Sequence, residues 1–192
     1  ILLPETWAGV CLAVSALAYA RGQWRLGAGI ALAGLFLREL LMPYVALCLF
    51  LAVRRRRWRE VAAWVLGLGA WSVFFAMHAM GAMSAMQPGD VAHPSWLQFG
   101  GFRFVLATVG FGGWLYLMPP WAAAIAVVLL AAGAWAPTRA AHVKGAVGAY
   151  IAFFAVVGQP FNQGWGLLTA PAWAIGFGLG AQGLATLFRQ AR

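Results

Sequence analysis

The sequence has few acidic residues and few charges of any kind. Only 4 of its 192 residues are Asp or Glu, against 13 Lys and Arg, and charged residues make up 9% of the chain. A soluble domain carries about 25% charged residues. Hydrophobic residues account for 64% of the chain. The composition therefore excludes an ordinary soluble domain and is typical of a protein that spans a membrane.

Cysteine is scarce too, and known catalytic or metal-binding motifs are absent. Cys11 and Cys48 stand in apolar segments, which argues against a disulfide framework, and we expect both to be packing residues. No HExxH, CxxC, GxSxG or P-loop pattern occurs. Asp90 and His93 are three residues apart in a loop-like segment, which is a weak pattern for a metal. The sequence predicts no identifiable cofactor, and a divalent metal stays an open alternative that no motif supports.

The basic residues occur in short clusters between apolar stretches. The clusters are Arg21/Arg25, 54–57 with Arg59, Arg139/Lys144 and Arg189/Arg192. Such clusters are topology signals, because Lys and Arg are retained on the cytoplasmic side of a membrane. Their placement argues against a nucleic-acid partner despite the net charge of +9.

Seven membrane crossings follow if every cluster is cytoplasmic. The predicted fold is all-α: a polytopic membrane helical bundle that forms a single integral-membrane domain over residues 1–192, with the C-terminus cytoplasmic. The predicted crossings are 3–20, a short hairpin of two within 26–53, 61–80, 121–136, 145–159 and 167–188. A polar loop at 81–101 and a turn at 160–166 lie on the outer side. Because the chain starts at Ile1 without a signal peptide, we expect an upstream part to be missing.

Residues 102–117 do not fit this scheme as a crossing. Counting them would place the Arg139 cluster outside, and Gly110, Gly112 and Gly113 interrupt the segment before Pro119. We predict an aromatic-rich helix that lies in the outer interface. A partly inserted segment is the alternative.

Arg38 and Glu39 interrupt the apolar run 26–53. One helix over this run would be about 42 Å long and would place a basic cluster outside. Two short helices that meet at Arg38-Glu39 satisfy the charge rule, with each charge at the favourable end of its helix and Pro43 in the first turn of the second. This V-shaped hairpin leaves two interpretations of the pair: Arg38 binds an anionic group, or the two residues cap and fix the tip.

Further polar residues are predicted on the outer side. The turn "GQPFNQGWGLL" contains the candidates Gln159, Asn162, Gln163 and Trp165, and Arg103 stands apart from the basic clusters. Amides and aromatic rings suit sugar hydroxyls and faces, and Arg suits phosphate. The alternative is an interfacial turn with a Trp anchor.

Two ionisable residues in basic segments are expected to have no function. Glu60 is expected to be a solvated charge beside Arg59, and His142 to be inert in a basic loop.

Four segments occur in an order that resembles a known family. They are "PETWAG" at 4–9, "GLFLREL" at 34–40 followed by Pro43-Tyr44, "RRRRWRE" at 54–60 and "GQPFNQGWGLLTAP" at 158–171. Together they are similar to the downstream half of bacterial polytopic glycosyltransferases of the GT-C class, the group of dolichyl-phosphate-mannose-type mannosyltransferases. The resemblance covers nearly the whole chain.

The resemblance implies a function and roles for several residues. It implies an enzyme of the bacterial plasma membrane that moves a sugar from a polyprenyl-phosphate donor to a lipid, glycan or protein acceptor on the extracytoplasmic face. The acidic base of that class follows the first span of the complete protein, and nothing in this chain matches it. Arg38 would lie near the lipid phosphate and the turn 162–165 near sugar or phosphate, with Glu39, Arg103 and Gln159 as further substrate-binding candidates.

Two other classes of membrane protein share these features. A transporter or flippase-like protein would also need an outward-facing polar cluster, although the sequence shows no inverted repeat. A non-catalytic membrane assembly subunit would need no polar cleft. Convergence of Arg38, Glu39 and the turn at Asn162 in space would favour a binding site.

Overall fold

The structure, a computed structural model, describes residues 3–87, 98–112, 114–138 and 140–191. All regular secondary structure in these residues is helical, which confirms the predicted all-α class. The α-helices are α1 (Pro4–Ala20), α2 (Trp24–Leu37), α3 (Met42–Arg54), α4 (Trp58–Ser84), α5 (Gly101–Phe111), α6 (Pro120–Ala132), α7 (Ala141–Val156) and α8 (Gly166–Gln190). Short 3-10 helices are η1 (Glu39–Leu41), η2 (Trp114–Leu117), η3 (Gly133–Trp135) and η4 (Pro160–Trp165). Asp90 and His93, in the predicted outer loop, lie outside the described residues.

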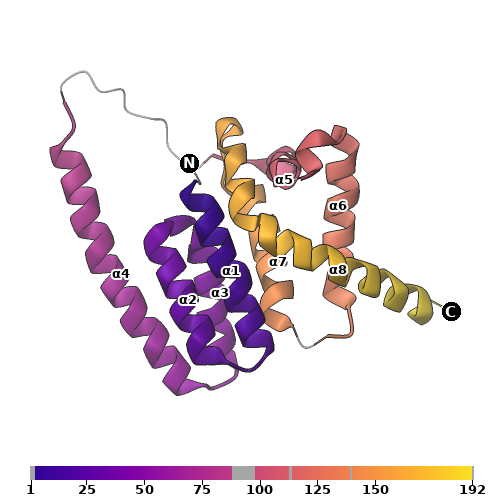
Figure 1. The fold of residues 1–192 in the computed structure, drawn as a ribbon, viewed down its shortest axis with the longest axis horizontal. Helices are drawn as coiled ribbons and strands as arrows, with labels where there is room; N and C mark the ends of the chain where they lie inside the picture. The colour runs from indigo at the N-terminus through magenta and orange to yellow at the C-terminus, as the bar shows by residue number, and fades with distance from the viewer. Residues whose placement is uncertain (1–2, 88–97, 113, 139, 192) are drawn as a thin grey trace.

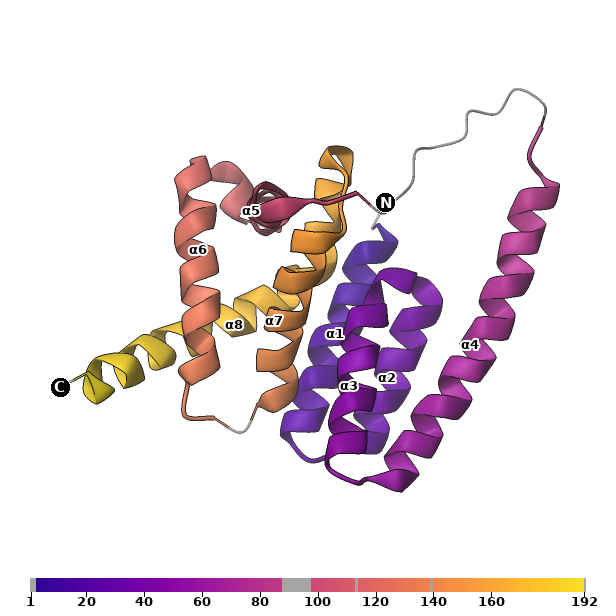
Figure 2. The same cartoon turned by 180° about the vertical axis from the view of Figure 1, so that it is seen from behind.

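The helices pack in two groups (Figure 1). Helices α1, α2 and α3 run side by side with α4 along one flank, and α5, α6 and α7 form the other group, which α8 crosses obliquely (Figures 1 and 2). The end that holds the turns α1–α2 and α3–α4 is called the basic end below, and the end that holds η1, α5 and η4 is called the tip end.

Helix α4 is the most exposed of the long helices. Only Glu60 and Trp64 are buried along its 27 residues. Among the described residues, α4 is the one helix that is long and apolar enough to cross a membrane by itself. The number of seven crossings therefore stays a prediction.

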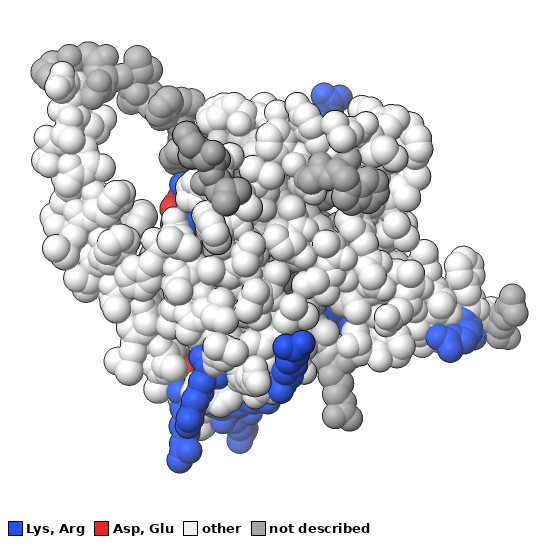
Figure 3. Space-filling view, in the orientation of Figure 1, with Lys and Arg blue, Asp and Glu red and all other residues white. Residues whose placement is uncertain are grey.

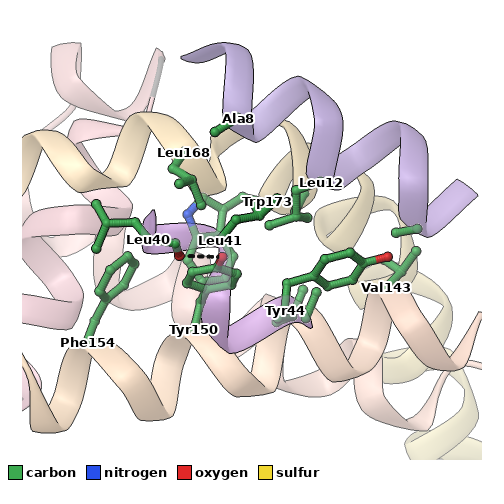
Figure 4. Close-up of a cluster of buried hydrophobic side chains, with 14 of the residues drawn as sticks. Ala8, Leu12, Leu40, Leu41, Tyr44, Val143, Tyr150, Phe154, Leu168 and Trp173 are labelled. Atoms are coloured by element: carbon green, nitrogen blue, oxygen red, sulfur yellow. Dashed lines mark hydrogen bonds between the residues drawn. The ribbon is translucent and has the colours of Figure 1, made fainter. Parts of the chain in front are cut away.

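The predicted break at Arg38 is present. Helix α2 ends at Leu37, Arg38 adopts an extended backbone (φ −154°, ψ 118°), and η1 leads into α3 with Pro43 in its first turn. The tip of this hairpin is fixed from the core, because the Tyr150 hydroxyl donates a hydrogen bond to the carbonyl oxygen of Leu40 over 2.9 Å (Figure 4). Leu41 is fully buried beside it.

The two turns at the basic end have the same backbone design. In each, the two residues after the C-cap (Arg21 or Arg55) donate backbone N–H hydrogen bonds to carbonyl oxygens of the preceding helix. In the first turn Gly22 donates to Tyr19 and Gln23 to Ala18, and in the second Arg56 donates to Val53 and Arg57 to Ala52. This is the Schellman motif, whose C′ residue has a left-handed backbone. The φ angles of Gly22 and Arg56 are 77° and 55°. Each turn is followed by a Trp-Arg pair that opens the next helix, Trp24-Arg25 and Trp58-Arg59.

Helix α5 lies across the tip end, nearly perpendicular to α6 and α7 (Figures 1 and 2). The predicted helix 102–117 is shorter in the structure: α5 ends at Phe111, within the run of glycines, and the chain continues as η2. Glycine permits close contact at two points, because the Cα of Gly166 lies against the Thr108 carbonyl and that of Gly158 against the Phe104 ring. These contacts set α5 and η4 side by side.

Candidate functional site

Arg38 lies in an ion-pair cluster at the hairpin tip. Its Nη2 is 2.9 Å from Oε1 of Glu5, and its Nη1 is 3.1 Å from Oε1 of Glu39. Consecutive residues in a helix diverge, but the extended backbone of Arg38 lets it pair with its neighbour. One guanidinium facing two carboxylates leaves the cluster with a net charge of −1, which repels an anionic phosphate. The geometry favours the interpretation of Arg38 and Glu39 as residues that fix the tip to α1.

The predicted binding turn is divided between core and surface. Trp165 is buried with an exposed fraction of 6% and packs edge-on against Phe104, with ring centroids 6.0 Å apart. Gln159 and Asn162 are buried as well, at 7% and 8%. Gln163 alone of these four is exposed. Trp165 is therefore a core residue, and Gln163 is the side chain of the turn most available to a ligand.

Gln163 and Arg103 meet at two adjoining hollows of the tip end. The first, of about 320 Å³, lies between α5, η2 and the start of α6 and is lined further by Phe111, Tyr116 and Pro119. The second, of about 430 Å³, lies on the other side of Arg103 toward Gln98 and Pro160. Gln98 and Gly158, which both line the second hollow, are joined by a hydrogen bond of 2.9 Å from the Gly158 N–H to the Gln98 carbonyl oxygen. Arg103 makes no ion pair with any carboxylate among the described residues.

An apolar groove adjoins the first hollow. It has a volume of about 500 Å³ and runs between α6 and α8, and its lining includes Trp121, Ile125, Leu129 and Phe177. Leu115 and Met118 line both the groove and the first hollow. The hollow that holds Arg103 and Gln163 and the apolar groove therefore adjoin, with Leu115 and Met118 between them.

The structure joins some of the predicted site residues and separates others. Arg103 and Gln163 lie together, whereas Arg38 and Glu39 line neither of the two hollows. The convergence of Arg38 with the turn at Asn162, which would favour a binding site, is therefore not found at these hollows. Sequence reasoning missed the groove, because its lining residues come from three separate segments and are all apolar.

No metal site is formed by the described part of the chain. In it, no three His, Cys, Asp or Glu side chains come close enough together to hold an ion. Asp90 and His93 lie outside that part, so the metal alternative based on them is not tested.

The chain was compared with protein-family models, with curated proteins and with solved structures. None of the three comparisons finds a match, so the resemblance to the GT-C class rests on the four sequence segments alone.

Proposed function

We propose that this chain is the part of an integral-membrane glycosyltransferase that holds a polyprenyl-phosphate sugar donor. The phosphate and sugar lie in the hollows at Arg103 and Gln163, and the isoprenoid chain lies in the groove between α6 and α8. The observation that carries the proposal is that the hollow with Arg103 and Gln163 adjoins the apolar groove, since Leu115 and Met118 line both. A substrate with a charged head and a long apolar tail needs this combination of surfaces.

The chemistry of the hollow fits a phosphate-linked sugar. A guanidinium without a carboxylate partner is a strong donor to phosphate oxygens, and the Gln163 amide can hydrogen-bond to sugar hydroxyls. Phe111 and Tyr116 line the same hollow and offer ring faces to a sugar. No carboxylate is among the described residues that line either hollow, and the resemblance assigns the general base to an upstream segment.

Membrane placement is part of the proposal and is supported by the outer surface. Large apolar side chains such as Leu66, Met77 and Val128 are more than 60% exposed, and such surfaces are stable in lipid rather than in water. Lys and Arg gather at the basic end (Figure 3), as expected for the cytoplasmic side. The tip end, with its hollows, then faces the extracytoplasmic side, and the bundle makes seven crossings.

Binding of farnesyl phosphate to the purified protein tests the proposal. Arg103→Ala removes the phosphate donor, and we expect binding to weaken about tenfold or more, since a hydrogen bond to a charged group contributes about 1.5–3 kcal/mol. Ile125→Trp fills the groove, so it should weaken the binding of farnesyl phosphate and leave the binding of methyl phosphate unchanged. Val128→Trp is the matched control, because Val128 is exposed on the same helix but does not line the groove.

Two outcomes would contradict the proposal. Equal loss of farnesyl phosphate binding in the Ile125→Trp and Val128→Trp variants would remove the groove as the tail site. Binding without any transfer of sugar from polyprenyl-phosphate sugars, in a protein that also carries the upstream segment that the resemblance implies, would leave a carrier or flippase-like protein.

A further inference from the structure

Another hollow, with a different chemistry from the two at the tip end, lies at the basic end. It has a volume of about 540 Å³ and is formed between the start of α2 and the turn that leads from α3 into α4. Four arginines and two tryptophans line it: Arg25, Arg56, Arg57, Arg59, Trp24 and Trp58. It is separate from the hollows of the donor site, with which it shares no lining residue.

The charge of this hollow is strongly positive. Glu60 is its single acidic lining residue, and its side chain is only 3% exposed and 3.5 Å from Nη1 of Arg57. Four positive charges and one negative charge leave a net +3. The remaining guanidiniums have no carboxylate partner among the described residues, so the hollow is able to take an anion.

The backbone at Arg56 supports a ligand role. Arg56 occupies the C′ position with a φ of 55°, where the equivalent residue of the first turn is Gly22. In the left-handed region a residue with a side chain is less stable than Gly. The turn would be more stable with glycine at this position than with arginine. The arginine side chain lines the hollow.

The aromatic residues indicate where the anion comes from. Trp58 is 65% exposed, and the guanidinium carbon of Arg25 lies 5.6 Å from the centroid of the Trp24 ring. Tryptophan is enriched at the level of lipid headgroups, and basic pockets between helices on the cytoplasmic side suit phosphate-bearing headgroups.

We infer that this hollow binds the phosphate of an anionic phospholipid headgroup in the cytoplasmic leaflet. The inference rests on the membrane placement in the proposed function but not on sugar transfer. Arg25 and Arg59, each the second residue of its helix, donate hydrogen bonds to the phosphate from two sides. Arg56 and Arg57 contact it from the α3–α4 turn. The rings of Trp24 and Trp58 lie in the headgroup layer, at the depth of the bound phosphate.

Retention of lipid by the protein purified in neutral detergent tests the inference. The protein is incubated with equal amounts of phosphatidylglycerol and phosphatidylcholine, and bound lipid is counted by native mass spectrometry. We expect phosphatidylglycerol to be preferred by about tenfold or more, and Arg25→Gln/Arg59→Gln to bring the ratio close to one. Arg21→Gln/Arg54→Gln is the matched control: it removes the same charge from the same two turns, at residues that do not line the hollow, and should keep the preference.

A further variant separates binding from folding. Arg56→Gly relieves the left-handed backbone, so its thermal stability should be equal to or higher than that of the unaltered protein while its preference for phosphatidylglycerol falls. Three results would overturn the inference: equal loss of preference in the Arg25/Arg59 and Arg21/Arg54 variants, full preference in Arg56→Gly, or displacement of the lipid by inorganic phosphate at equal concentration. The last would show a site for free phosphate.

Discussion

The imidazole of His142 stacks on the ring of Tyr19 at the basic end, with centroids 3.9 Å apart. Its exposed fraction is 5%. Burial, and then the positive charges of Arg55 and Arg57, lower the pKa of His142 to about 4. The side chain is therefore neutral at pH 7, and it lies just before the proposed crossing 145–159.

The depressed pKa of His142 predicts a loss of stability in mild acid. His142 of the unfolded chain is protonated below its ordinary pKa of about 6.5, whereas His142 of the folded chain is protonated only below about pH 4. The contribution of the neutral His142 to stability is therefore fully present above about pH 6.5 and is lost as the pH falls from about 6.5 toward 4. We expect the melting temperature in detergent to drop between pH 7 and pH 4.5, by an amount equivalent to about 1–3 kcal/mol. His142→Gln should flatten this part of the pH profile. An unchanged slope in that variant would show that other groups cause the loss.

Single charges were the least predictable feature of the sequence. The pattern predicts a solvated Glu60 beside Arg59 and an inert His142 in a loop, yet both are buried and Glu60 pairs with Arg57 instead. Sequence neighbours indicate which charges are near in the chain but not which face of α4 or α7 turns inward. Glu5, the second partner of Arg38, was missed because the two residues meet only through the packing of α1 on the hairpin.

At the scale of elements, the sequence predicted the break at Arg38, but the second α-helix begins at Met42 and not at Glu39, because the 3-10 helix η1 comes between. If the two basic clusters lie at the same membrane face, the chain must reverse between them, and the opposite charges fit the helix dipoles only if the break falls at Arg38. The shared turn design at the basic end was not predicted, since few residues besides the Trp-Arg pairs are common to the two turns. The end of α5 at Phe111 follows from its glycines.

The tip cluster predicts energetic coupling between Glu5 and Arg38. Glu5 is 13% exposed in its side chain, so Arg38→Met leaves a largely buried carboxylate unpaired and should destabilise the protein by about 1–3 kcal/mol. Adding Glu5→Gln should recover part of that loss, and a double-mutant cycle of melting temperatures measures the coupling. Glu39→Gln is the control, because Glu39 is 47% exposed and should cost less than 1 kcal/mol. Strict additivity of Glu5→Gln and Arg38→Met would contradict the role of the cluster in fixing the tip.

At the scale of the whole molecule, most charged side chains of the described residues lie at the tip end or at the basic end of an apolar bundle. The tip end combines Arg103, which has no carboxylate partner among the described residues, with an apolar groove, and the basic end carries a net positive hollow. The all-α class and the membrane composition follow from the sequence, because they depend on residue counts and run lengths. The groove could not be predicted from the sequence, because it depends on the angle between α8 and α6.

Photo-crosslinking tests the central claim, the position of a polyprenyl-phosphate donor, most directly. A farnesyl phosphate with a diazirine in its second isoprene unit is irradiated with the protein in membrane vesicles, and the labelled peptides are sequenced. The account predicts labels on α6 and α8 along the groove, at and around Ile125 and Phe177, that unlabelled farnesyl phosphate competes away and that Arg103→Ala reduces. Competable labelling confined to α1–α4, with none on α6 or α8, would contradict it.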